Sequence, residues 1–239
     1  MSNLSVVVEG VTVSFNSRYV LRDVSLGFPP GLHVILGRNG SGKTTLFRVI
    51  DALIKPLKGS VRVLGRDVFK LSRKEVARVI GYVWQNPTYG FFEESVEREV
   101  KFILKNLGIA GREDVIEILG IQGLLDRSPF ALSGGEARLV SIASVIIADQ
   151  PVLLLDEPFT SLDMDGVIRV YALIKKLRSE GKTVVIATHN ILLAEVLKPD
   201  TVTLLDRGVV IYHGGLSGVS DELLEEVGVV SRRWFCSVC

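Results

Sequence analysis

One nine-residue stretch constrains the fold of this chain more than any other. Residues 37–45 read Gly-Arg-Asn-Gly-Ser-Gly-Lys-Thr-Thr and fit the phosphate-binding template G-x-x-x-x-G-K-[ST]. The apolar run 32–36 predicts a buried strand before the stretch, and segment 46–54 predicts a helix after it. Glycines let backbone N–H groups turn toward phosphate oxygens at a helix N-terminus, which favours anions. The stretch therefore predicts a site for the phosphates of a nucleotide.

Two side chains of this loop have predicted roles of their own. Lys43 supplies a point charge for the β- and γ-phosphates, and the Thr44 hydroxyl is a ligand for Mg²⁺. The residues expected to contact the nucleotide are Gly37, Arg38, Asn39, Gly40, Ser41, Gly42, Lys43, Thr44 and Thr45.

A second segment, 152–157, predicts the acidic half of the same site. Four apolar residues indicate a buried strand, and Asp156 and Glu157 follow at its carboxyl end, where open α/β sheets bind their ligands. Asp156 is placed to hold a hydrated Mg²⁺, and Glu157 to take a proton from the attacking water. Two solvated acids at a strand end are the alternative, which the phosphate loop upstream disfavours.

A third segment, Leu-Ser-Gly-Gly-Glu at 132–136, predicts a second anion site. Ser133 can cap the helix that follows, and the two glycines expose backbone N–H groups at the helix start. A second phosphate site has no evident use within one copy of the chain. Such a site has a use if it faces the phosphate loop of another copy of the chain.

With these three segments in order, the chain resembles the ATP-binding subunits of ABC (ATP-binding cassette) transporters over essentially all of its length. The resemblance implies a P-loop fold of the ABC ATPase type, ATP and Mg²⁺ as ligands, and ATP hydrolysis. It assigns 37–45 to Walker A, 152–157 to Walker B with Glu157 as catalytic glutamate, and 132–136 to the signature motif that closes on the partner's ATP.

The resemblance also implies roles for single residues elsewhere. Gln85 matches the glutamine that senses Mg²⁺, water and the transmembrane partner, and His189 matches the switch histidine at the γ-phosphate. Asp163 belongs to the D-loop, 161–163, and Phe15 stands where an aromatic ring stacks on adenine, with Tyr19 as a second candidate. The nucleotide-contacting residues implied in the signature are Ser133, Gly134, Gly135 and Glu136.

The signature helix departs from the family pattern at three positions. Glu136 stands where glutamine is common, Leu139 stands where arginine is usual, and another arginine is usual near Ser144. These changes question the usual polar contacts of this helix and leave the phosphate site intact.

The segment that follows Gln85 is similar to the Gln-Asn-Pro stretch of energy-coupling-factor ATPases, which power vitamin, cobalt and nickel uptake. Its aromatic residues Tyr89, Phe91 and Phe92 fit a groove that receives a coupling helix from a membrane subunit. They equally fit packing inside the helical segment, and the sequence leaves both interpretations open.

Apolar strands that alternate with amphipathic helices predict an α/β fold with a mostly parallel core sheet. We expect an N-terminal antiparallel β subdomain, with turns at 9–10, 16–18 and 29–31, and helices at 93–107, 113–125, 134–147 and 164–179. We divide the single domain into a core, 1–85 and 150–215, a helical signature subdomain, 86–149, and a C-terminal helix and tail, 216–239.

Composition limits the remaining possibilities. The net charge of +1, from 28 basic and 27 acidic residues, favours no nucleic-acid partner. No apolar run approaches the roughly 18 residues that span a bilayer, and no signal peptide is evident. We therefore expect a peripheral protein at the cytoplasmic face of the membrane. Cys236 and Cys239 lack a second ligand pair and are expected in a frayed tail as reduced thiols.

The resemblance implies a head-to-tail dimer, of identical or paralogous copies, that drives separate transmembrane subunits, most consistently for import. Two alternatives stay open: a soluble ABC ATPase without a transporter, such as the cluster-assembly type, and an exporter ATPase. The transported solute is not encoded here, because its contacts lie on other chains.

Overall fold

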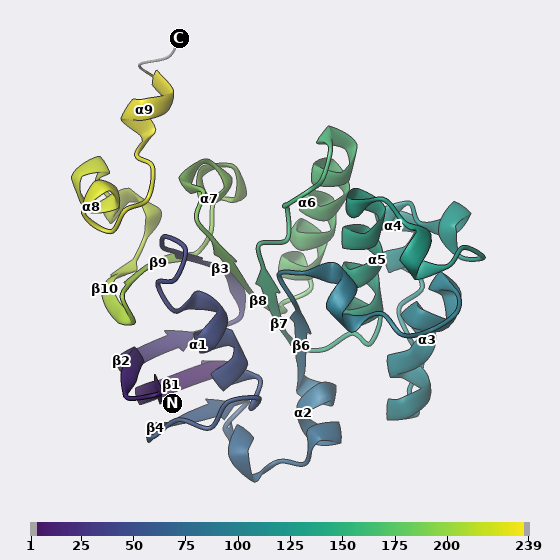
Figure 1. Ribbon diagram of the computed structural model, residues 1–239, viewed down its shortest axis with the longest axis horizontal. Helices are drawn as coiled ribbons and strands as arrows, with labels where there is room; N and C mark the ends of the chain where they lie inside the picture. Colours follow the sequence, from purple (N-terminus) through teal and green to yellow (C-terminus); the bar gives the residue numbers. More distant parts are fainter. Residues whose placement is uncertain (1–3, 237–239) are drawn as a thin grey trace.

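Two β-sheets form the frame of the molecule in the computed structural model, which describes residues 4–236 and the side chains of residues 4–234 (Figure 1). The smaller sheet is antiparallel and has the strand order β2-β1-β4-β5. Its strands are β1 (Val6–Phe15), β2 (Arg18–Phe28), β4 (Lys58–Val63) and β5 (Arg66–Asp67). Buried valines alternate with more exposed residues along β1, so one face of this sheet faces the core.

The larger sheet has the order β10-β9-β3-β8-β7-β6 and is parallel apart from β10. Its strands are β3 (Gly31–Leu36), β6 (Ile80–Val83), β7 (Val152–Asp156), β8 (Thr183–Thr188), β9 (Thr201–Asp206) and β10 (Val209–Gly214). Every residue of β3, β6, β7 and β8 is buried, as expected for parallel strands covered on both faces.

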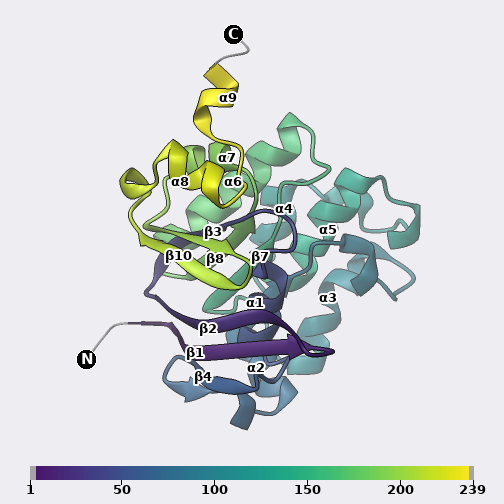
Figure 2. The same cartoon turned by 60° about the vertical axis from the view of Figure 1, so that its left-hand side comes forward.

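Helix α1 (Lys43–Ile50) lies between the two sheets (Figure 2). Its residues Leu46, Phe47 and Ile50 are fully buried in a core that also contains the inward valines of β1 and residues of β7 and β8. Burial of three large side chains contributes roughly 5–9 kcal/mol to folding at about 1.5–3 kcal/mol each. The phosphate loop is therefore anchored at its helical end by both sheets.

The opposite face of the parallel sheet is covered by helices. The longer helices are α3 (Val96–Leu107), α5 (Gly134–Ile146) and α6 (Met164–Ser179). The shorter ones on this face are α4 (Asp114–Leu119), α7 (Ile191–Leu197) and α8 (Asp221–Glu226). Helix α2 (Arg73–Val79) instead contributes Val76 to the core that contains α1, and α9 (Arg232–Cys236) follows α8 near the C-terminus. Short 3-10 turns lie at Val68–Lys70, Pro87–Gly90, Gln122–Leu124, Pro129–Ala131 and Leu216–Gly218. The helices α3, α4 and α5 cluster at one side of the molecule (Figure 1).

The expected fold class is confirmed: a mostly parallel core, an antiparallel N-terminal sheet and an inserted helical segment. Among residues 4–236, no helix is long and apolar enough to cross a bilayer.

Several local predictions were wrong. The turn expected at 9–10 is an irregularity within the single strand β1, where Gly10 has φ 59°. The helix expected over 113–125 ends at Leu119, because Gly120 takes a left-handed conformation with φ 63°. Helix α7 was not predicted, since its seven residues are too few to show a periodic pattern.

The tail also differs from the expectation. Residues expected to fray form α9, which ends at Cys236. Cys239 lies outside the described residues, so the structure does not test the expected state of the two thiols.

Candidate nucleotide-binding site

The carboxyl ends of four adjacent parallel strands bring the predicted chemistry together. The phosphate loop follows β3, His189 follows β8, Asp156 ends β7, and Gln85 lies just beyond β6. The parallel register pairs Leu36 with Thr188 and Asp156 with Ala187, which places these ends at one edge of the sheet. The ends of parallel strands are where open α/β sheets bind ligands.

The loop encloses a cavity of about 240 Å³. Its lining residues are Val20, Asn39, Gly40, Ser41, Gly42, Lys43, Thr44, Thr45, Gln85, Asp156 and Glu157. Val20 is the one lining residue that the sequence did not suggest, and an apolar residue on a β-strand carries no signal of such a role.

Lys43 stabilises the loop in its present form. Its Nζ donates to the carbonyl oxygen of Gly37 at 2.5 Å and to that of Arg38 at 3.1 Å. Burial lowers the pKa of this ammonium group, and the charges of Glu157 and Asp156 oppose that shift. Within the described structure, both hydrogen bonds of this buried cation reach carbonyl groups, which suits an incoming anion.

Gly37 is required by close packing. A Cβ at this position would lie 2.3 Å from the backbone oxygen of Leu205 and 2.6 Å from Ser41 Oγ. Next to it, Arg38 pairs with Asp206 at 3.0 Å, so β9 also supports the loop. Gly42 has φ 113°, a conformation that side chains of L-residues rarely adopt.

Thr44 and Asp156, two of the residues predicted to contact Mg²⁺, lie in direct contact. Thr44 Oγ1 donates to Asp156 Oδ2 at 2.6 Å, and the hydroxyl of Tyr82 lies 3.4 Å from the same oxygen. Asp156 is 1% exposed and has no ion pair among the described residues. Burial raises the pKa of its carboxyl group.

This donor set fits Mg²⁺. One carboxylate and one hydroxyl converge beside the phosphate loop, and Mg²⁺ is usually held by one or two carboxylates together with substrate phosphates. No cluster of three acidic, histidine or cysteine ligands occurs in the described part of the chain.

Glu157 is held from three sides. His189 Nδ1 lies 2.6 Å from Oε1, and Thr188 Oγ1 donates to Oε2 at 3.0 Å. The backbone N–H of Glu157 donates to Ala187, and its φ of 49° is a strained value for a residue with a side chain. Thr188 is a site residue that the sequence analysis missed. Its only signal is a polar residue at the end of an apolar strand.

The predicted adenine contact lies apart from this cavity. Phe15 and Tyr19 flank a turn whose residues Asn16 and Ser17 have positive φ, and their rings are exposed by 47% and 54%. Neither ring lines the cavity, so the stacking role of Phe15 stays a prediction.

The signature residues form a separate hollow. Ser133 and Glu136 make a capping box: Ser133 Oγ accepts from the N–H of Glu136, and the Glu136 carboxylate accepts from the N–H of Ser133 at 2.8 Å. Residues Ser133, Gly135, Glu136, Ser161 and Asp163 line this hollow. Asp163 therefore lies with the signature, where it caps α6 by accepting from Gly166 at 2.8 Å.

The two hollows share no lining residue. The nucleotide cavity thus contains the loop, the carboxylates and Gln85, and the signature adds nothing to it within one chain.

Glu136 is further paired with Arg127 at 2.7 Å. The capping hydrogen bond from Ser133 is the largest cause of the lowered pKa of Glu136.

Known proteins resemble this chain along most of its length. The ABC transporter family profile matches residues 21–160. A Pyrococcus furiosus protein assigned as an ABC transporter ATP-binding protein is 43% identical over 202 residues, which cover 82% of this chain and 77% of the relative. The energy-coupling factor transporter ATP-binding protein EcfA of Methanoculleus marisnigri is 38% identical over 193 residues, 77% of this chain and 69% of the relative.

Solved structures give the same picture. CbiO1 of Clostridium perfringens, described as part of the ABC transporter complex CbiONQ, aligns with a TM-score of 0.78 at 28% identity and covers 99% of both chains. A dimeric ATP-binding cassette in a post-hydrolysis state with ADP and Pi aligns with a TM-score of 0.79 at 26% identity, covering 90% of this chain and all of the other.

Proposed function

Because this chain belongs to the ABC transporter family as an ATP-hydrolysing subunit, we propose that it powers the import of a solute through separate transmembrane subunits. ATP hydrolysis is supported by one observation: four side chains meet beside the phosphate loop, those of Thr44, Asp156, Glu157 and His189. Relatives named as energy-coupling factor ATPases support import.

The residues divide the reaction between them. Lys43 and the loop N–H groups hold the β- and γ-phosphates. Glu157 accepts a proton from the attacking water at a carboxylate oxygen. His189 lies outside the cavity lining, 2.6 Å from that carboxylate, and orients it. Gln85, at the cavity wall, positions the water.

Thr44 and Asp156 would hold Mg²⁺ with the phosphates. When bound, the ion neutralises the charge that develops on the phosphoryl oxygens. Asp156 is suited to this task because its carboxyl group is buried and forms no ion pair among the described residues.

The active unit we propose is a head-to-tail dimer. Its support is the separation of the two hollows in one chain, since the signature N–H groups at 133–136 need a second copy to meet a nucleotide. The dimeric structure of a similar cassette adds to this support. The core at 1–85 and 150–215, the signature subdomain at 86–149 and the C-terminal segment at 216–239 are the units we expect to move within the dimer.

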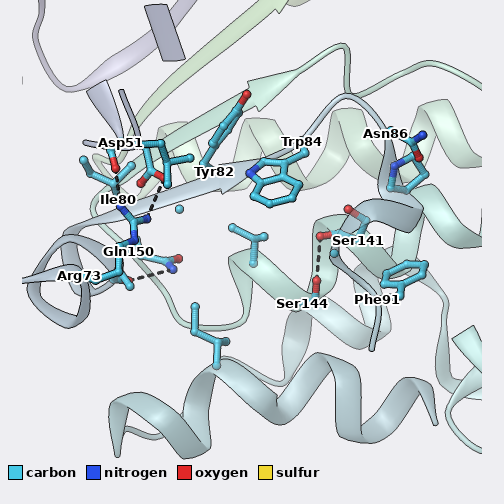
Figure 3. A pocket seen from close by; sticks show the side chains of 17 residues that line it. Asp51, Arg73, Ile80, Tyr82, Trp84, Asn86, Phe91, Ser141, Ser144 and Gln150 are labelled. Carbon is cyan, nitrogen blue, oxygen red and sulfur yellow. Dashed lines mark hydrogen bonds and ion pairs between the residues drawn. The ribbon is translucent and has the colours of Figure 1, made fainter. Parts of the chain in front are cut away.

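A second cavity, of about 340 Å³, is our candidate site for a transmembrane subunit (Figure 3). Asp51 and Arg73 lie at one end of it, Ser141 and Phe91 at the other, and Trp84 lies between them. It thus spans the boundary between the strand β6 and the signature helix α5. A partner bound there would contact both moving parts of the chain.

This cavity bears on the aromatic residues that the sequence left open. Phe91 lines the cavity and also belongs to the helical core, with 8% exposure. Phe92 packs edge-on against Phe102 at 4.4 Å between ring centroids, and Tyr89 is 76% exposed. We assign Phe91 to the partner groove and leave Tyr89 as a rim contact.

Purification of the tagged chain in detergent from its own cells tests the proposal. Co-purification of a multi-span membrane subunit would support the proposal and place this chain at the cytoplasmic face of the membrane. A soluble assembly partner with no membrane subunit would favour the soluble ABC ATPase. Solute accumulation in vesicles that carry the complex, with MgATP supplied on the cytoplasmic side, distinguishes import from export.

A further inference from the structure

Among the described side chains, Arg138 is the largest of those that are almost fully buried, with 1% exposure. It lies on α5, and its guanidinium reaches the chain just after β6. Nη1 donates to the carbonyl oxygen of Trp84 at 2.8 Å, and Nη2 donates to that of Gln85. One side chain therefore joins the signature helix to the backbone on which Gln85 stands.

Packing does not account for this arginine. Among the described residues Arg138 forms no ion pair, and its Nε has no hydrogen-bond partner. Burial lowers the pKa of the guanidinium, while the charges of Asp156 and Glu157 raise it. A buried, unpaired charge is costly, and an apolar residue of similar volume is often neutral or stabilising in its place.

The position of Arg138 along α5 connects two functional surfaces. The helix begins at the signature, with Ser133 as its cap, and Arg138 lies about one turn further on. Three residues later, Ser141 lines the cavity assigned above to a transmembrane partner. The neighbouring Leu139, which stands where arginine is usual in the family, is buried in the helical core.

We propose that Arg138 is a positioning residue that sets the place of Gln85 in the nucleotide cavity according to the position of the signature helix. This inference rests on the proposed function, because it requires Gln85 to act on bound ATP. In the proposed dimer the signature serves the partner's nucleotide and Gln85 serves its own. Arg138 then links the two sites through one rigid helix.

A double-mutant cycle on the full-length chain tests this inference. Arg138→Met removes the charge and the donors and keeps most of the side-chain volume. We expect kcat for ATP hydrolysis to fall roughly 10- to 100-fold, because a misplaced group far from the reacting atoms has effects of this size. In the Gln85→Ala background, Arg138→Met should cause no further loss, since the residue acts through Gln85.

The matched control is Arg78→Met. Arg78 also donates to a backbone carbonyl, that of Leu107 at 2.6 Å, but it lies on α2 and joins it to the end of α3. We expect this variant to keep the wild-type kcat. The fluorescence of Trp84 supplies a second readout in a Trp234→Phe background. There Arg138→Met should lower the fluorescence anisotropy of Trp84, because the Trp84 carbonyl no longer accepts a hydrogen bond from Arg138.

The outcomes separate the possibilities. If Arg138→Met lowers kcat by the same factor with and without Gln85, Arg138 acts independently and the inference is overturned, while the ATPase assignment stands. If Gln85→Ala hydrolyses ATP at the wild-type rate, both the role of Gln85 and this inference fail. Should Arg138→Met not fold, Arg138→Lys takes its place in the same cycle, because it keeps the charge and loses the paired donors.

Discussion

The imidazole Nδ1 of His189 lies 2.6 Å from Oε1 of Glu157. The other oxygen of the same carboxylate accepts a hydrogen bond from Thr188. Both partners stand at the end of β8, the strand between the phosphate-loop strand and the strand that carries Glu157. One strand end therefore sets the plane of the carboxylate that we assign as the base.

Glu157→Gln should abolish hydrolysis and preserve ATP binding. The amide has nearly the same shape but cannot take a proton from water, so we expect phosphate release to fall by roughly 10²- to 10⁴-fold. The variant should accumulate as an ATP-bound dimer with MgATP, measured by sedimentation. Glu94→Gln, at an exposed ion pair on the helical segment, is the control. Wild-type phosphate release by Glu157→Gln would show that the base is another group.

Thr44→Val should separate nucleotide binding from metal binding. The substitution keeps the side-chain shape and removes the hydroxyl that now contacts Asp156. We expect the affinity for ATP in EDTA to be unchanged and the gain in affinity on adding Mg²⁺ to be lost, as measured by calorimetry. Equal Mg²⁺ enhancement in both proteins would exclude Thr44 as a ligand.

Asp51 should make the stability of the protein fall as the pH rises from 4 to 7. Its side chain is buried and pairs with Arg73 through one carboxylate oxygen, while Oδ1 has no hydrogen-bond partner among residues 4–234. Burial raises the pKa of the carboxyl from 3.8 to about 6, against the opposing effect of Arg73. The folded state therefore binds the proton more tightly than the unfolded state does.

The protonated Asp51 carboxyl therefore adds about 3 kcal/mol to the free energy of unfolding. This contribution is fully present below pH about 4 and is lost as the pH rises through about 6. Asp51→Asn cannot titrate, so the free energy of unfolding of the wild type relative to this variant should fall by that amount between pH 4 and 7. Urea unfolding at each pH measures it. A constant difference across this range would refute the assignment.

Gly37→Ala should destabilise the fold far more than Gly40→Ala. The new Cβ at position 37 would meet the backbone oxygen of Leu205 at 2.3 Å, so the loop or β9 must shift, at about 3 kcal/mol. Gly40 has open space around it and φ 77°, so alanine there adds only backbone strain of about 1–2 kcal/mol. Urea unfolding without nucleotide measures both variants. Equal losses would contradict the packing role of Gly37.

Much of the site could be predicted because its parts are local in sequence. A phosphate loop is built from consecutive residues between one strand and one helix, and the pair of Asp156 and Glu157 simply ends an apolar strand. The capping box of Ser133 and Glu136 likewise spans four residues. Such patterns are visible because the backbone conformation they require is set by adjacent side chains.

Contacts between distant segments could not be predicted in this way. Thr188 reaches Glu157 across 31 positions, and Arg138 reaches Gln85 across 53. Neither residue type is unusual for its element, so no pattern marks it. Phe15 shows the converse, because a residue chosen by its place in a family pattern lies outside the lining of the cavity.

The sequence by itself determined that the chain binds a nucleotide, since the loop at 37–45 and the acids at 156 and 157 are each encoded within a few residues. Only the tertiary structure decided how these pieces meet. The strand order places β8 between β3 and β7, so that His189 and Thr188 converge on Glu157, and the insert docks α5 so that Arg138 enters the core. Strand order and docking depend on the packing of the whole apolar core, which local patterns do not specify.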